Sequence, residues 1–424
     1  MDYFNSKDGT LFCEDVDVNR IAKEVGTPAY IYSIRTIVEH YRKLDSAFAP
    51  VPHKICYSAK ANGNIAILKL LIEEGAGIDI VSGGELEAAL RAGADPSTIV
   101  FSGVAKTVKE IDAALTSGIL FFAVESEGEL LRIDQRAKAL GKTGHFSVRV
   151  NPDVDPKTHR YITTGKLENK FGLTTISARD LYRRSLELKN VKAVGVHMHI
   201  GSQLLSAKPF LEGIKKLKVL VGEVREMGID IKYLDIGGGF GVTYNTEKPL
   251  LAEEYAEGII PEIEDLDVEL LLEPGRFIMA NAGILVTEVQ YVKENPLKRF
   301  VIVDAGMNDL IRPALYDAYH KIIVTKGGSG KKMIVDVVGP ICESSDVLGA
   351  AVELPEVKQG DLLAVRTAGA YGFSMSSNYN MHPRPVEVLV NGDRYDIIRS
   401  RETFDQLFQN QNLPDFLRSK EMGV

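Results

Sequence analysis

The feature that most restricts the fold of this chain is an alternation of short apolar runs with amphipathic helical patterns between residues 31 and 280. Eight runs have the length and composition of buried strands, at 54–60, 78–82, 99–102, 120–125, 145–151, 193–200, 232–237 and 268–273. Helical patterns lie between them at 65–74, 85–92, 108–117, 127–140, 178–188, 210–227 and 253–263. Eight strands alternating with helices over roughly 250 residues predict an α/β fold with a TIM-like (β/α)8 barrel.

A doubly wound open sheet is the competing arrangement for such an alternation. The barrel is favoured by the number of runs and by the polar residues that end nearly all of them: Lys60, Ser82, Ser102, Glu125, Asn151, His199, Asp235 and Glu273. In barrel enzymes the carboxyl ends of the strands meet at one face, and the catalytic residues lie there. These strand ends are therefore the first places to look for chemistry.

The chain has 424 residues, which is long for a single core, so two domains are expected. After residue 281 the runs become short and β-branched, with turn sequences such as 326–330 and 391–392 between them, which is typical of antiparallel β structure. Strand-like segments also occur at 10–13 and 29–32. We predict a barrel at 31–280, and a C-terminal antiparallel β-sandwich or β-barrel-like domain at 281–424 that also takes in the N-terminal strands of 1–30.

Composition indicates which kinds of partner the protein can bind and in which cell compartment it is expected. The net charge of −8 argues against nucleic acid, which binds a basic face, and no apolar run approaches the length of a membrane span. The N-terminus is polar and lacks the apolar stretch of a signal peptide. Three cysteines, Cys13, Cys56 and Cys342, form no disulfide framework. These features predict a cytoplasmic protein that binds neither nucleic acid nor a membrane.

Lys60 ends the first strand-like run, just before the glycine-bearing turn at 61–63. At a barrel mouth, desolvation or a nearby cation would lower the pKa of the amine and make it a nucleophile toward a carbonyl group. A lysine at a strand end is more often an ordinary surface residue. Lys60 alone therefore does not indicate a catalytic site, and the motifs at the other strand ends are needed as evidence.

The seventh run is followed by four glycines in five residues, Gly237, Gly238, Gly239 and Gly241. Glycines allow successive backbone N–H groups to wrap a phosphate. The dinucleotide fingerprint G-x-G-x-x-G fails here because its third glycine position is Val242. The segment predicts a phosphate loop of another kind.

The eighth run ends in Glu273-Pro274-Gly275-Arg276. A carboxylate at this position could keep a pyridine nitrogen protonated, which makes the ring an electron sink, and Gly275 could offer an N–H to phosphate. Barrel enzymes often bind phosphate near strands seven and eight. A structural pair of Glu273 and Arg276 is the plainer alternative.

The sixth run carries His197 and His199, which alternation places on one face. Their spacing also raises the possibility of a zinc site, but no cysteine is near and Gly201-Ser202-Gln203 follows, which suits phosphate better. One of the two histidines could be an ordinary core residue.

The second domain contributes further candidates. Arg312 and Tyr316 are four residues apart and share one face of a helical turn, and Arg312 suits a carboxylate. Cys342 and Glu343 pair a proton donor with a group that binds cations, although buried cysteines are usually inert. Tyr371 lies between small residues and could point at a ligand.

Together these motifs resemble those of the fold-type III pyridoxal-phosphate decarboxylases, over essentially the whole chain. The resemblance rests on 57–62, 197–203, 237–241, 273–276, 304–316, 342–346 and 370–372. The first four motifs are similar across basic amino-acid decarboxylases. The segments 304–316, 342–346 and 169–172 resemble the branch that converts meso-2,6-diaminopimelate to L-lysine and carbon dioxide, the last step of lysine biosynthesis.

The resemblance implies a pyridoxal 5'-phosphate cofactor carried by Lys60, with His199 stacked on the ring and Glu273 facing the ring nitrogen. It implies that Ser202, Gly238, Gly239, Gly275, Arg276 and Tyr371 lie around the cofactor, and that Arg276, Arg312, Tyr316, Glu343 and Tyr371 bind the substrate. It implies Cys342 as the proton donor and no metal. Cys342 and Glu343 would come from the partner chain of a homodimer, so the active sites would be shared between subunits.

Other functions remain open from the sequence. Within the class, the substrate could be ornithine, arginine or carboxynorspermidine. A racemase would leave Cys342 and the arginines without a purpose, and a catalytically silent binding protein would not need Lys60. An aldolase that uses Lys60 without a cofactor would leave the glycine loop and Glu273 unexplained.

Overall fold

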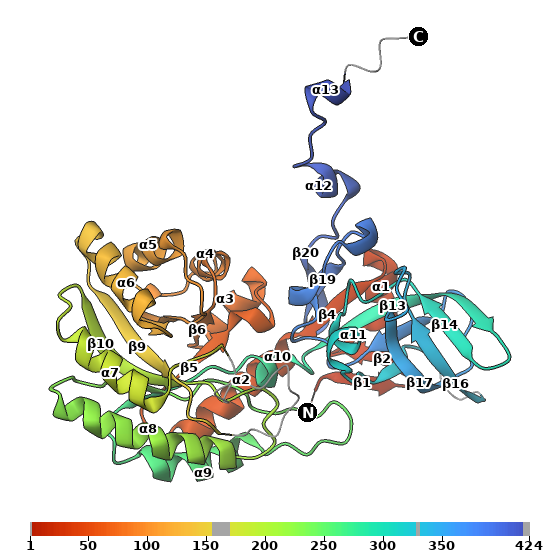
Figure 1. Cartoon of the computed structure of the whole chain (residues 1–424). Helices are drawn as coiled ribbons and strands as arrows, with labels where there is room; N and C mark the ends of the chain where they lie inside the picture. Colours follow the sequence, from red (N-terminus) through yellow and green to blue (C-terminus); the bar gives the residue numbers. More distant parts are fainter. Residues whose placement is uncertain (1, 155–169, 328–330, 419–424) are drawn as a thin grey trace.

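The computed structural model describes residues 2–154, 170–327 and 331–418. Eight parallel strands form a closed barrel in the order β10-β11-β12-β5-β6-β7-β8-β9 (Figure 1). The strands are β5 (His53–Ser58), β6 (Gly77–Ile80), β7 (Ile99–Phe101), β8 (Phe121–Val124), β9 (Gly144–Val150), β10 (Val191–Met198), β11 (Tyr233–Asp235) and β12 (Glu269–Leu272). The pairing of β12 with β5 closes the ring. The predicted barrel is confirmed, and the open sheet is excluded.

All seven predicted helices follow their strands: α3 (Ile65–Glu73), α4 (Gly83–Arg91), α5 (Val108–Ser117), α6 (Glu127–Leu140), α7 (Thr175–Ser185), α8 (Lys208–Glu226) and α9 (Ala252–Ile263). Their limits reflect capping chemistry. The Thr107 side chain and Glu110 form a capping box at the start of α5, and Gly118 and Gly141 end α5 and α6 with positive φ angles of 76° and 62°, which glycine adopts without strain.

An additional helix, α2 (Ile34–Phe48), precedes the first barrel strand and was not predicted. It contacts α9 and α3, so it fills the place of the eighth helix between the last and first helices of the ring. The short helix α10 (Arg276–Met279) follows β12 and also contacts α2. The chain therefore completes the helical ring before it enters the barrel.

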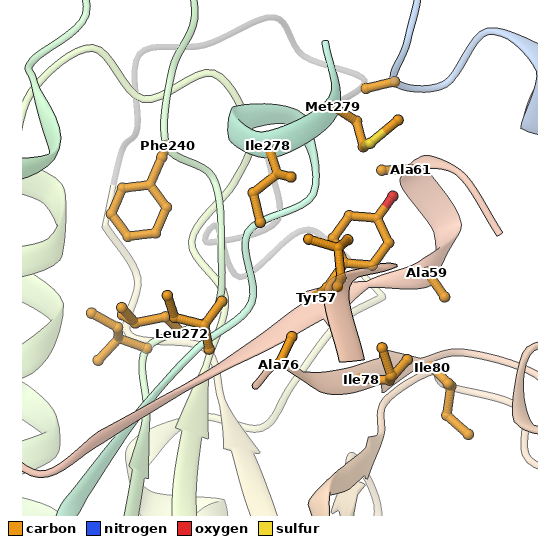
Figure 2. Close-up of a cluster of buried hydrophobic side chains, with 14 of the residues drawn as sticks. Tyr57, Ala59, Ala61, Ala76, Ile78, Ile80, Phe240, Leu272, Ile278 and Met279 are labelled. Atoms are coloured by element: carbon orange, nitrogen blue, oxygen red, sulfur yellow. The ribbon is translucent and has the colours of Figure 1, made fainter. Parts of the chain in front are cut away.

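The turn that carries Lys60 is held by buried apolar side chains (Figure 2). It is a 3-10 turn, Ala59–Ala61, whose two alanines are 1% and 0% exposed. Tyr57 on β5 is fully buried, and its hydroxyl donates to the carbonyl oxygen of Asn62 at 3.0 Å. Packing on both sides of Lys60 leaves its side chain to extend from a fixed backbone.

The second domain contains a nine-stranded sheet whose main path is β17-β16-β14-β13-β4-β19-β20, with β18 paired to β13 and β15 paired to β18. Its strands are β4 (Ala29–Ser33), β13 (Gly283–Glu294), β14 (Arg299–Val303), β15 (Ile322–Val324), β16 (Lys332–Val338), β17 (Val347–Pro355), β18 (Leu362–Val365), β19 (Val386–Asn391) and β20 (Arg394–Arg399). Most pairs are antiparallel, as predicted, but β14–β16 and β19–β4 are parallel, so the sheet is mixed. Strand β17 was not predicted.

The N-terminal strands join this domain in two ways. Strand β4 lies inside the nine-stranded sheet, between β13 and β19. Strands β1 (Phe4–Lys7), β2 (Thr10–Cys13) and β3 (Val16–Asp17) form a separate small sheet. Its buried Leu11 and Cys13 share a hydrophobic cluster with Ile284 of β13 and Val388 of β19.

Residues 155–169, which follow β9 in the sequence, lie outside the described residues, and they include the first position of the segment 169–172. At the other end, α12 (Phe404–Phe408) and α13 (Asp415–Arg418) extend away from both domains (Figure 1). Among the described residues, no helix is long and apolar enough to span a membrane.

Candidate active site

Lys60 lies at the carboxyl end of β5, and its amine forms an ion pair with a carboxylate of the next strand. Its Nζ atom is 2.9 Å from Oδ2 of Asp79, which is buried on β6. The Ser58 hydroxyl donates to the same oxygen at 2.8 Å. The amine is thus positioned by a charge-assisted hydrogen bond as well as by the backbone turn.

The electrostatics of Lys60 differ from the sequence-based expectation. Burial favours the neutral amine, but the carboxylates of Asp79 and Glu273 outweigh it and raise the pKa of Lys60 above its ordinary value. The expectation of a lowered pKa for Lys60 is therefore wrong. Asp79 is a buried carboxylate within hydrogen-bonding distance of the amine, and no sequence motif marked it. Lys60 is cationic at neutral pH in this arrangement.

Glu273 follows β12 and faces the same end of the barrel. It is 3% exposed, its Oε1 accepts from the Ser102 hydroxyl at 3.4 Å, and its Oε2 lies 3.6 Å from Nε2 of His197. Burial alone would raise the pKa of Glu273, but His197 and Lys60 lower it well below its ordinary value. Glu273 is therefore a buried group that stays ionised.

Asp235 stands next to this carboxylate at the end of β11. Burial, and then the charge of Glu273, raise the pKa of Asp235 well above its ordinary value. Ligand atoms of His197, Asp235 and Glu273 lie within 4.8 Å of one another. The imidazole of His197 lies beside Glu273 and favours its negative charge.

The two histidines of the sixth run have different surroundings. His197 is fully buried beside Glu273, whereas His199 follows β10 and lines the cavity that contains Lys60. Burial, and then Arg149 and Lys60, lower the pKa of His199 well below its ordinary value. The Gly238 N–H donates to its Nδ1 at 3.2 Å. A neutral His199 ring is thus held at the mouth, and it is not among the ligand groups that cluster with His197.

The glycine loop after β11 has no room for side chains. Gly237 and Gly239 have positive φ angles of 71° and 104°. A Cβ atom at Gly238 would overlap the carbonyl oxygen of Glu273, and one at Gly239 would overlap that of Gly201. The loop therefore lies directly on the ends of β10 and β12. The N–H groups of Gly237 and Gly238 donate to Asp235 and to His199, and glycine at these positions lets the backbone approach a ligand closely.

Arg276 begins α10 and is buried at the edge of the site. Its Nη2 donates to the Ser202 hydroxyl at 3.0 Å and its Nη1 to the Tyr244 hydroxyl at 2.7 Å. The guanidinium carbon lies 4.9 Å from the centre of the Tyr371 ring, a cation–π geometry. The structure thus brings Ser202, Arg276 and Tyr371 together.

Arg312 reaches the same region from the second domain, at the start of α11 (Arg312–Tyr316). It is buried, its Nε donates to Nε2 of His320 at 3.2 Å, and its guanidinium carbon lies 5.1 Å from the Tyr244 ring centre. Burial and then Arg312 lower the pKa of His320 to about 3. Two buried cations therefore flank one tyrosine, and Tyr316 lies on the same short helix.

Tyr371 connects the second domain to the turn of Lys60. Its backbone N–H donates to the Ala61 carbonyl at 2.8 Å, and its φ of 57° is a strained value for a bulky residue. A Cβ atom at Gly275 would lie 3.4 Å from the Tyr371 hydroxyl. Such strain at a ligand-facing position is common where function requires it.

A cavity of about 410 Å³ opens beside Lys60, within the usual size range of small-molecule sites. It is lined by Lys60, Val81, Ser102, Gly103, Val104, Ala105, Arg149, Phe171, His199 and Glu273. Arg149 on β9 forms a buried ion pair with Glu125 at 3.1 Å. A polar, charged cavity at the carboxyl end of a parallel barrel can hold a small anionic ligand.

Cys342 and Glu343 lie elsewhere on the chain. Both are exposed on the loop between β16 and β17, and neither lines the cavity of Lys60. The Cys342 N–H donates to Oδ1 of Asn380 at 2.9 Å, and the Tyr379 hydroxyl donates to the Glu343 carboxylate. Buried Asp346 fixes the loop by accepting from the N–H of Ile341 at 2.7 Å.

Four residues of the site were not identified from the sequence: Asp79, Arg149, Tyr244 and His320. Asp79 and Arg149 are charged residues inside apolar strand runs, and a buried charge in a barrel strand is itself a signal of function. Tyr244 and His320 lie in loops that carry no recognisable motif.

Comparison with known proteins first gives the class. Residues 34–280 match the family described as "Pyridoxal-dependent decarboxylase, pyridoxal binding domain". This range contains all eight barrel strands, Lys60, the glycine loop and Glu273.

Similarity to individual proteins then identifies the particular family within this class. A diaminopimelate decarboxylase of Haemophilus influenzae is 48% identical over 410 residues, which cover 96% of this chain and 99% of that protein. The structure of the M. jannaschii diaminopimelate decarboxylase in complex with L-lysine superposes with a TM-score of 0.94, at 40% identity over 98% of this chain and 99% of that one. A lysine/ornithine decarboxylase of Vibrio vulnificus in complex with putrescine is more distant, with a TM-score of 0.78 and 25% identity over 88% of this chain and 97% of that one. The chain therefore belongs to the diaminopimelate decarboxylase family of pyridoxal-dependent decarboxylases.

Proposed function

We propose that this protein decarboxylates meso-2,6-diaminopimelate to L-lysine and carbon dioxide with pyridoxal 5'-phosphate as cofactor. The observation that carries the proposal is the pair of buried cations, Arg276 and Arg312, whose guanidinium carbons lie 5.8 and 5.1 Å from the centre of the Tyr244 ring, near a barrel mouth that contains Lys60. The family relationship supports the same reaction, since relatives of 48% identity are named for it. The proposal assigns cofactor binding to residues 31–280, and the remaining segments, 1–30 and 281–424, to a second domain.

The site residues fit the proposed cofactor. Lys60 offers an amine for covalent attachment. The backbone at Gly238, Gly239 and Gly275 forms a cradle that has no room for side chains, which suits the close approach of a phosphate. Ionised Glu273 suits a protonated ring nitrogen, and neutral His199 suits a ring face. When bound, pyridoxal phosphate supplies the electron sink that accepts the electron pair left behind by carbon dioxide.

The proposed substrate has an amino-acid group at each end, so one end must be recognised without reacting. Arg276 and Arg312 would hold the distal carboxylate, assisted by the hydroxyl groups of Tyr316 and Tyr371. Glu343 would hold the distal ammonium. A substrate that ends in an amine alone would leave two buried cations without an anion, which discriminates strongly against it.

A second subunit would complete the site. Since Cys342 and Glu343 are exposed on the surface of their own chain, we propose a homodimer in which they enter the partner's barrel mouth. Cys342 would then deliver a proton to the α-carbon after carbon dioxide has left. The buried thiols of Cys13 and Cys56 are unpaired with each other, which suits the cytoplasm.

A substrate panel tests the proposal against its alternative. Steady-state rates would be measured with meso-diaminopimelate, L-ornithine, L-arginine and carboxynorspermidine. We expect kcat/KM for meso-diaminopimelate to exceed the others by roughly 10⁴ or more, because the competitors lack the distal carboxylate. Comparable values for any basic amino acid would overturn the substrate assignment and leave the class intact.

A further inference from the structure

The last described part of the chain is an arm that stands apart from both domains (Figure 1). This C-terminal arm, residues 402–418, contains α12 and α13. Its large apolar side chains are mostly exposed: Phe404 is 66%, Phe408 45%, Leu413 65%, Phe416 74% and Leu417 51% exposed. Contiguous exposed apolar residues of this kind mark an interaction site.

The helices of the arm are too short to be stable by themselves. They contain five and four residues, whereas isolated helices shorter than about 12 residues are marginal in water. A capping box between Thr403 and Gln406 supports the start of α12, but this helix has no buried residue. The arm therefore needs a surface to cover it.

Two apolar residues of the arm have helical spacing. Phe404 and Phe408 are four residues apart within α12, so they lie on one face of that helix. Leu413 precedes α13, and Phe416 and Leu417 lie within α13. The apolar face of α12 is the pattern of a helix that docks on another surface.

The base of the arm is attached to the surface that carries Cys342 and Glu343. The Glu402 carboxylate accepts from Nδ2 of Asn378 at 2.6 Å and from Nε of Arg384 at 2.7 Å. Two residues from Asn378, Asn380 accepts from the Cys342 N–H. The arm and the Cys342 loop therefore begin on one continuous surface.

We propose that the C-terminal arm packs against a second copy of this chain and stabilises the dimer. The proposal rests on the proposed function to the extent that Cys342 must enter the partner's site. A surface that faces the partner at Cys342 also directs the adjoining arm toward it. Two-fold symmetry then gives each subunit one donated arm and one received arm.

Self-association of a charged variant tests the proposal. In the variant, Phe404, Phe408 and Phe416 are all replaced by glutamate, and sedimentation equilibrium gives its dimer dissociation constant. We expect a rise of roughly tenfold or more, since buried aromatic anchors dominate interface energies. The matched control is Val219→Glu, whose side chain is 63% exposed on α8. A variant that dimerises as tightly as the control, or a wild-type chain that is monomeric, would overturn the proposal.

A cross-linking experiment identifies what the arm touches. Phe416 is replaced by the photoreactive residue benzoylphenylalanine in full-length chains, and two differently tagged versions are co-expressed. We expect cross-links between the two tags. Cross-links only within one chain, or only to other proteins, would contradict docking on a second copy. The wild-type substrate panel is independent of these results, so a failure of the proposed reaction would be seen separately.

Discussion

The amine of Lys60 lies 2.9 Å from a carboxylate oxygen of buried Asp79, and this ion pair, whose lysine is partly exposed, defines the resting state of the site. Asp79 is itself influenced by burial and by Glu273, which raise its pKa, while Lys60 lowers it. The second oxygen of Asp79 has no hydrogen-bond partner in the described residues. Among the neighbouring charges, the Asp79 carboxylate contributes most to keeping Lys60 protonated.

Replacing Asp79 by asparagine should make Lys60 reactive at lower pH. Since Asp79 raises the pKa of the amine, its loss should lower that pKa. The rate at which the protein reacts with pyridoxal phosphate, followed by absorbance from pH 6 to 10, should then rise at correspondingly lower pH. The wild-type ion pair also stabilises the fold below the ordinary pKa of lysine, and this contribution is lost as the pH rises through the raised value.

The control for this experiment is Asp112→Asn, which breaks the ion pair with Arg136 on the outer helices. Its pH profile should match the wild type. An Asp79→Asn profile that also matches the wild type would show that Asp79 does not hold the charge of Lys60.

Replacing His320 by phenylalanine should weaken substrate binding through Arg312. The neutral ring accepts from Nε of Arg312 at 3.2 Å, and its loss leaves a buried cation with one donor unsatisfied. We expect KM for meso-diaminopimelate to rise roughly tenfold, with a smaller effect on kcat. The matched control is Tyr319→Phe, an exposed neighbour.

The pH dependence of this variant separates positioning from general destabilisation. Because the pKa of His320 is lowered to about 3, the ring stays neutral at physiological pH and adds no inflection to the KM profile. The stability that depends on the neutral ring is lost as the pH falls below the ordinary histidine value toward 3. An inflection in wild-type KM near pH 6.5 that disappears in His320→Phe would contradict this account.

The glycine loop should tolerate no side chain. Gly239→Ala combines a φ of 104° with overlap of the Gly201 carbonyl, so we expect a loss of about 2 kcal/mol or more in the free energy of unfolding. The affinity for pyridoxal phosphate should fall as well. Gly222→Ala on α8 is the control, since nothing lies within 4 Å of its added Cβ; it should stabilise the helix by roughly 0.5–1 kcal/mol. Equal stability of the two variants would refute the cradle.

Shared active sites predict complementation between two inactive variants. Lys60→Ala and Cys342→Ala, co-expressed with different tags, should form mixed dimers that contain one intact site. Activity should return to roughly a quarter of the wild-type value in a random mixture. No recovery, with mixed dimers verified by the two tags, would place Cys342 and Lys60 of one chain in the same site.

Most of the fold could be predicted because strand and helix periods are local properties. Each of the eight barrel runs became a strand, and the helices predicted at 108–117 and 127–140 have those limits in the structure. Helix α2 was missed because it precedes the first barrel strand in the sequence. Its place in the helical ring beside α9 exists only once β12 pairs with β5. The parallel pairing of β19 with β4 joins residues more than 350 positions apart, and such long-range pairings leave no local pattern.

The candidate site was predictable at strand ends and less so elsewhere. Lys60, Glu273 and the glycine loop carry recognisable motifs at positions where barrel geometry places function. Asp79 changes the charge state of Lys60, yet it appeared only as one polar residue within an apolar run. His320 acts on Arg312 from a loop, and no periodicity connects the two residues.

The most direct test of the central claim is to combine the purified protein with pyridoxal phosphate and meso-diaminopimelate and to follow carbon dioxide and L-lysine together. The account predicts that both products appear in equal amounts with the wild-type protein and that neither appears with Lys60→Ala. Absence of both products from a wild-type protein that has bound the cofactor would contradict the proposed reaction.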